Sequence, residues 1–156
     1  MLAACGFSPL YGGTAGPNNV PGAFEEISIA SIPERHGQIL RNALMDRIYR
    51  SGTPAAPQYR VEVNNLSLET EDLVETIRAD VSREQVTASG TLRLIDLSTG
   101  EELFAQRIRA IGSYNVLDSQ FATRISEREV TENVLNELAL RIERALAVYF
   151  AGQSAS

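Results

Sequence analysis

The sequence predicts an α+β fold: a four-stranded, mostly antiparallel sheet with two helices packed on one face, in the order β-α-β-β-β-α. Three observations lead to this expectation. Several segments alternate apolar and polar residues with the period of two that a half-buried strand has. Two other segments repeat apolar residues at steps of three and four, which is typical of an amphipathic helix. A sheet with both helices on one face buries all of these apolar stripes together.

We expect three regions along the 156 residues. Residues 1–22 are rich in glycine, proline and asparagine and are predicted to form a flexible tether. Residues 23–150 are expected to form a single α+β domain, because a chain of this length fits one hydrophobic core. Residues 151–156 are small and polar and are predicted to be a disordered tail.

The first strand and the first helix are predicted at the start of the domain. Ile27 and Ile29 alternate with polar or small neighbours, as in a strand. Ser31 and Glu34, with a proline between them, form a predicted capping box for the helix. Gly52 is expected to stop this helix. Its apolar stripe comprises Ile39, Leu40, Ala43, Leu44 and Ile48.

Three strands follow. The second strand of the sheet begins at Tyr59, and we expect it to continue over residues 73–78 after a bulge or kink at residues 71–72. Residues 86–94 alternate as a third strand, and residues 103–110 form the return strand.

A hairpin turn and a long helix complete the pattern. Residues 96–101 form the turn, with Gly100 at its left-handed position. The helix has two alternative starts, a capping box at residues 126–129 or an earlier start at residues 118–119. Its stripe comprises Val130, Val134, Leu138, Ile142, Leu146 and Tyr149.

Composition and motifs argue against several function classes. The net charge of −6 argues against nucleic-acid binding, which favours a basic surface. We expect no enzyme, metal or cofactor: His36 is the only histidine, and Cys5 lies on the tether with no base in reach. The acidic residues from Glu69 to Glu75 lack calcium-loop spacing and are interpreted as a solvated loop. No apolar run is long enough to span a bilayer as a helix.

Arginines are the remaining candidates for binding. All 14 cationic residues are arginine, whose planar guanidinium suits phosphate and carboxylate groups. Arg107 and Arg109 lie two apart on a predicted strand and therefore share a face. Arg60 and Arg93 on neighbouring strands are expected to join them as contacts for a phosphorylated ligand or a partner. A mixed-charge face exposed to solvent is the alternative interpretation.

The N-terminus carries a truncated lipobox. Cys5 is the only cysteine and follows Leu2, Ala3 and Ala4, the small-residue pattern that precedes the lipidated cysteine of a bacterial lipoprotein. The basic and apolar parts of a signal peptide do not precede it. A chance tetrapeptide is the alternative. We expect lipidation at Cys5 of the natural protein.

Two motifs resemble the LPS-assembly lipoprotein LptE family in its α-proteobacterial form. They are Cys5-Gly6-Phe7-x-Pro9-Leu10-Tyr11-Gly12 and Ile32-Pro33-x-Arg35-x-Gly37-Gln38-x-Leu40-Arg41-Asn42-x-Leu44. The resemblance extends at pattern level from Cys5 through the final helix. It implies two helices on a four-stranded sheet, which agrees with the order derived above.

The resemblance also implies a role without catalysis. Such a protein would plug an LptD-like outer-membrane β-barrel, assist its assembly and help lipopolysaccharide to reach the outer leaflet. It would be anchored through lipid on Cys5 at the periplasmic side of the outer membrane. The alternative is a periplasmic lipid-binding lipoprotein that serves as an auxiliary subunit of a lipid transporter.

Overall fold

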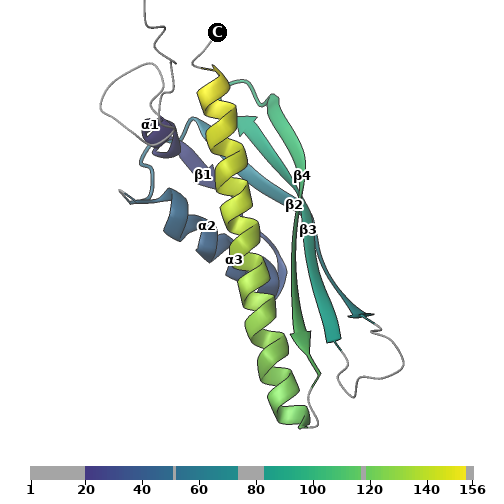
Figure 1. Cartoon of the computed structure of the whole chain (residues 1–156). Coiled ribbons are helices and arrows are strands. Elements are labelled where there is room, and N and C mark those ends of the chain that lie inside the picture. The colour runs from purple at the N-terminus through teal and green to yellow at the C-terminus, as the bar shows by residue number, and fades with distance from the viewer. Residues whose placement is uncertain (1–19, 51, 74–82, 117–118, 154–156) are drawn as a thin grey trace, which may run out of the picture.

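The computed structural model describes residues 20–50, 52–73, 83–116 and 119–153 (Figure 1). Cys5 and the tether up to residue 19 lie outside these residues, as do residues 154–156 of the predicted tail. The elements are α1 (Val20–Phe24), β1 (Ile27–Ile29), α2 (Glu34–Ile48), β2 (Tyr59–Leu73), β3 (Arg83–Asp96), β4 (Glu102–Asn115) and α3 (Gln120–Gln153).

The strands form one sheet in the order β1-β2-β3-β4. The β2–β3 and β3–β4 pairs are antiparallel, whereas β1 and β2 are parallel because the chain crosses over between them through α2. The predicted α+β class and the mostly antiparallel sheet are confirmed. β4 lies at one edge of the sheet.

Both long helices cover the same face of this sheet (Figure 1). α3 runs along β3 and β4, and α2 packs beside α3 next to β1. The predicted stripe of α3 faces the core, where Leu138 and Leu146 are fully buried. Leu40 and Leu44 of α2 are also fully buried in this core. Within the described residues, no helix covers the opposite face of the sheet (Figure 1).

The start of α2 differs from the prediction. Pro33 occupies the N-cap position and no side chain caps the helix, so the expected capping box is absent. Ile32 is buried against Gly37, where a Cβ would lie 2.7 Å from Cγ2 of Ile32 and 2.8 Å from its carbonyl oxygen. This contact sets how the chain enters the helix and leaves Ser31 exposed, ahead of the helical turn it was expected to cap.

The bulge of β2 also lies elsewhere than predicted. β2 is continuous through residues 71–72, and its register against β3 shifts between Asn64 and Ser67. Asn65 adopts a left-handed φ of 52°, which asparagine tolerates better than most residues. Because of the bulge, Val63 and Leu68 both face the core although they are five residues apart. In a regular strand, residues an odd number of positions apart face opposite sides of the sheet. Residues 74–78 of the predicted continuation lie outside the described residues.

The hairpin turn is confirmed. Gly100 has a φ of 75°, and the Asp96 carboxylate accepts hydrogen bonds from the backbone N–H of Ser98 (2.7 Å) and of Thr99 (3.2 Å). A hydrogen bond from the Ser98 hydroxyl, together with these two backbone hydrogen bonds, holds the pKa of Asp96 below its usual value.

Two predicted boundaries shift. α3 begins at Gln120, close to the earlier of its two predicted starts, where the Ser119 hydroxyl accepts a hydrogen bond from Ala122 N–H (3.4 Å). It continues to Gln153, so the first residues of the predicted tail are helical. α1 likewise includes the last residues of the predicted tether. Both additions are explained by packing, because α1 and the end of α3 meet through Phe24 and Phe150.

Candidate functional site

The four predicted arginines lie on the face of the sheet that the helices leave open, but they form two separate pairs. Arg60 Nε lies 2.9 Å from Glu62 Oε1, and Arg93 Nη1 lies 3.4 Å from Glu62 Oε2. Arg93 also pairs with Glu102, which raises the pKa of its guanidinium. Arg60 and Arg93 are therefore neutralised by carboxylates.

Arg107 and Arg109 have different surroundings on β4. They stand opposite Thr91 and Ser89 of β3, so in the described sheet no acidic residue is their direct cross-strand neighbour. Arg109 donates a hydrogen bond of 3.4 Å to the Thr87 hydroxyl. Among the described residues neither arginine forms an ion pair. These two cations remain available to an external anion.

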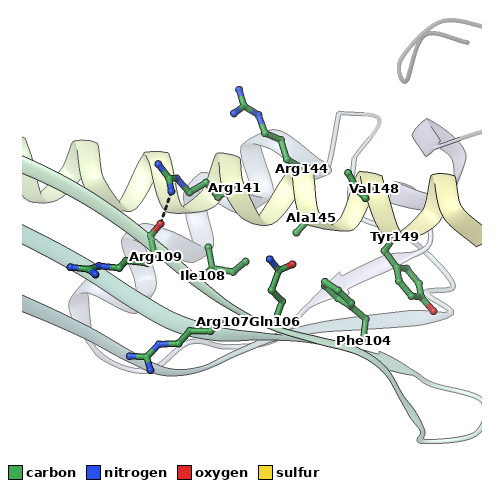
Figure 2. Close-up of a pocket in the computed structure, with 10 residues that line it drawn as sticks. All are labelled: Phe104, Gln106, Arg107, Ile108, Arg109, Arg141, Arg144, Ala145, Val148 and Tyr149. Atoms are coloured by element: carbon green, nitrogen blue, oxygen red, sulfur yellow. Dashed lines mark hydrogen bonds between the residues drawn. The ribbon is translucent and has the colours of Figure 1, made fainter. Parts of the chain in front are cut away.

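A groove of about 450 Å³ lies between β4 and α3 (Figure 2). Arg107 and Arg109 contribute from β4, with Arg107 pointing away from the helix. Arg141 and Arg144 contribute from α3. The groove therefore gathers four arginines from two elements. We name these four residues the groove arginines.

Arg141 joins the two walls of the groove. Its Nε lies 3.0 Å from Glu137 Oε1 on the same helix, and its Nη1 donates a hydrogen bond of 2.9 Å to the Arg109 carbonyl oxygen. Arg144, one turn further along α3, is exposed and forms no ion pair among the described residues. Glu137 is thus the only carboxylate paired with a groove arginine in the described part of the chain.

The other end of the groove is apolar. The rings of Phe104 and Tyr149 lie 5.4 Å apart, centroid to centroid, and Ala145 lies beside them. Val148 is 65% exposed at the rim, although most apolar side chains of α3 are buried or half-buried. The groove thus combines an apolar end with a cationic end. The described residues that line it include no histidine, cysteine or carboxylate, and their side chains suit the binding of anions and apolar groups.

Sequence reasoning missed Arg141 and Arg144. A usable signal was present: both lie between stripe positions of the predicted last helix, three residues apart, and so share its outer surface. What the sequence could not supply is the register between that helix and the edge strand, which brings Arg141 to Arg109.

Other candidate residues stand apart from the groove. The acidic residues Glu69, Glu71 and Asp72 are exposed, as predicted, but they lie on β2 rather than in a loop. The reason is that β2 continues without interruption to Leu73. His36 is half-buried near the start of α2. No helix within the described residues is both long enough and apolar enough to cross a bilayer.

The fold was compared with known proteins. No family model and no curated protein sequence matches the chain. Among solved structures, a Caulobacter crescentus CB15 protein described as a lipoprotein matches with a TM-score of 0.67 at 24% identity, covering 88% of this chain and 99% of that one. A minor lipoprotein from Acinetobacter baumannii matches with a TM-score of 0.66 at 16% identity, covering 80% and 92%.

Rare lipoprotein B from Shewanella oneidensis matches with a TM-score of 0.58 at 13% identity, covering 79% of this chain and 92% of that one. The chain shares its fold with these lipoproteins. Because the matches include nearly the whole of each of these chains, the likeness concerns the complete two-layer arrangement rather than a single motif within it.

Proposed function

We propose that this protein is a lipid-anchored outer-membrane lipoprotein that works as LptE does, without catalysis. In this proposal lipid on Cys5 holds the chain at the periplasmic side. The folded domain plugs an LptD-like barrel, assists its assembly and helps lipopolysaccharide to insert into the outer leaflet. The observation that carries the proposal is the two-layer fold, which rare lipoprotein B shares over most of both chains.

The open face of the sheet supports a plug role. Part of it is satisfied within the molecule: Arg60 and Arg93 pair with Glu62, and Ser67 and Ser89 share a hydrogen bond of 3.0 Å between their hydroxyls. Such a face remains stable next to water and polar side chains. The interior of an outer-membrane barrel is polar in the same way.

The groove arginines support contact with lipopolysaccharide. Phosphate groups accept paired hydrogen bonds from the planar guanidinium of arginine. Arg107 and Arg144 form no ion pair among the described residues, so a bound phosphate would displace no carboxylate from them. A local cationic patch of this kind can bind an anion even though the whole chain carries a net charge of −6.

Co-expression with the cognate barrel tests the plug role. We expect a stable complex that survives affinity purification on the barrel, and recovery of the barrel without this chain would overturn the proposal. Lipidation is tested separately with the natural precursor, in which Cys5→Ser is expected to abolish incorporation of labelled fatty acid and release the protein from membranes.

Lipopolysaccharide binding is tested with Arg107→Glu/Arg109→Glu. We expect weaker binding at unchanged stability, because exposed charge changes cost little. The effect of Arg93→Glu on binding is harder to interpret, because the substitution also breaks the ion pairs of Arg93 with Glu62 and Glu102. The matched control is Arg35→Glu/Arg124→Glu, which changes net charge equally at exposed positions outside the groove. Equal loss in both variants would mean that only net charge matters.

A second candidate is a periplasmic lipid-binding lipoprotein, the auxiliary subunit of a lipid transporter. The observation in its favour is the groove itself, whose apolar end at Phe104 and Tyr149 and cationic end at Arg109 match the two ends of an anionic lipid. Native mass spectrometry that recovers bound lipid, together with no barrel complex, would favour this candidate over the first.

A further inference from the structure

β4 is a long edge strand with one free side. It pairs with β3 from Glu102 to Asn115 and has no strand beyond it in the described sheet. The Arg109 carbonyl points away from β3, because it accepts the hydrogen bond from Arg141 (Figure 2). Backbone groups alternate between the two sides of a strand, and the register here is regular. Arg107 and Ile111 therefore also direct their N–H and C=O groups outward.

Proteins usually protect such an edge, since a row of unpaired N–H and C=O groups is a template for another strand. The protection of β4 is slight in the described structure. One side chain, that of Arg141, occupies one carbonyl, and the flanking residues Arg107 and Ile111 are exposed. The edge borders the groove that contains the groove arginines.

We propose that the free edge of β4 binds an extended acidic segment of a partner protein, which adds to the sheet as a fifth strand. Strand addition combines backbone hydrogen bonds, which give affinity, with contacts of alternate side chains, which give specificity. The inference goes beyond the proposed function and holds whether or not that partner is a barrel.

The surroundings of the edge specify the chemistry of this segment. An added strand would present alternate side chains to the two faces of the sheet. On the open face they would meet Arg107 and Arg109, which favour carboxylates. On the helix side they would meet Val148, Tyr149 and Ala145, which favour apolar groups. The segment is therefore one in which acidic residues alternate with apolar residues.

Charge also discriminates between occupants. A second copy of the chain, added through its own β4, would bring Arg107 and Arg109 close to the same arginines, and like charges on adjacent strands repel. An acidic segment instead supplies the anions that Arg107 and Arg144 lack among the described residues. Arg141 is positioned to move from the Arg109 carbonyl to a carboxylate of the incoming strand, which frees that carbonyl for pairing.

The experiment uses the full chain and a short fluorescein-labelled peptide in which glutamate alternates with valine or threonine. We expect saturable binding, and we expect the amides of Arg107, Arg109 and Ile111 to exchange more slowly with solvent when the peptide is present. A peptide of equal charge with proline at the alternate positions should not bind, because proline cannot donate the backbone hydrogen bonds.

Two pairs of variants separate charge from backbone pairing. Arg107→Glu/Arg144→Glu should weaken binding by at least about tenfold, because two charge-assisted hydrogen bonds are lost. Arg35→Glu/Arg124→Glu should change it little. Ile111→Pro removes one outward N–H without changing charge, at an edge position where proline is tolerated, and should weaken binding relative to Ile111→Ala.

The outcomes that would overturn the proposal are distinct. Equal binding of the proline peptide would mean that attraction is electrostatic only. Unchanged exchange of the β4 amides would mean that the peptide binds elsewhere, and this measurement on the unmodified chain needs no variant to fold. If the protein bound lipopolysaccharide vesicles but not the peptide, the ligand of this site would be a lipid. None of these readouts involves a barrel, so the plug proposal stands or fails separately.

Discussion

Glu143 of α3 and Arg47 of α2 join the two long helices, with Oε2 and Nη1 3.3 Å apart. Arg50 approaches the other carboxylate oxygen, also at 3.3 Å. The Glu143 side chain is only 5% exposed, whereas the Arg47 and Arg50 side chains are 33% and 71% exposed. The carboxylate is therefore the buried partner, and the arginines can still be hydrated.

This difference in burial predicts that removing the carboxylate and removing the arginines change the free energy of unfolding unequally. Glu143→Gln should lower the free energy of unfolding by about 1 kcal/mol, since the arginines return to water. Arg47→Ala/Arg50→Ala should cost more, about 3 kcal/mol, because it leaves a buried carboxylate without its cations. Urea unfolding of both variants checks the order. A larger loss from Glu143→Gln would contradict this assignment of the buried partner.

Gly37→Ala is expected to destabilise the protein although alanine favours helices. The new Cβ would meet the Ile32 backbone, with the carbonyl oxygen at 2.8 Å. We expect a net loss of about 1–2 kcal/mol by thermal or urea unfolding, after the gain in helix propensity. Gly152→Ala is the matched control: it meets nothing within 4 Å, so stability should stay equal or rise.

Leu138→Ala should cost about 2–5 kcal/mol, because this side chain is fully buried in the core below α3. Val148→Ala on the same helix removes a side chain that is 65% exposed and should cost less than about 0.5 kcal/mol. Urea unfolding measures both. Similar losses for the two variants would mean that the apolar stripe is assigned to the wrong side of α3.

Tyr114 is expected to make stability depend on alkaline pH. Burial, together with the hydrogen bond that its hydroxyl donates to Glu84, raises its pKa well above the usual value of 10.0. The folded state holds this proton more tightly than the unfolded chain. The stabilisation is therefore complete below pH 10.0 and is lost as pH rises above it.

Two measurements check this assignment. The unfolding free energy of Tyr114→Phe should fall less steeply than that of the unmodified protein as pH rises from about 10 to about 11. In the folded protein, phenolate absorbance below about pH 11 should be the same with and without Tyr114, because that phenol stays protonated. A smaller absorbance change in Tyr114→Phe would contradict the raised pKa.

Much of the fold could be predicted from apolar periodicity alone. The stripe of α3 and the alternation of β3 and β4 each follow from local spacing, and so does the turn at Gly100. The start of α2 could not, because Ser31 and Glu34 match a capping box while burial of Ile32 on Gly37 decides the geometry. Tertiary packing overrides the local signal at that point.

The candidate site was less predictable than the fold. Alternation placed Arg60, Arg93, Arg107 and Arg109 on one face, and the structure confirms that placement. It could not show that Glu62 and Glu102 neutralise two of them, since this depends on cross-strand register. Alternation also could not predict the contact between Arg141 and β4. That contact depends on how the helix packs on the edge strand, and the sequence pattern of neither segment contains this information.

The contact between Phe24 and Phe150, whose ring centroids lie 6.5 Å apart, joins α1 to the last turns of α3. Both ends of the described chain emerge at one pole of an elongated molecule (Figure 1). The 34 residues of α3 extend for about 50 Å from there to the opposite pole. The first residue of α1 and the first residue of α3 therefore lie at opposite poles, separated by about the full length of α3.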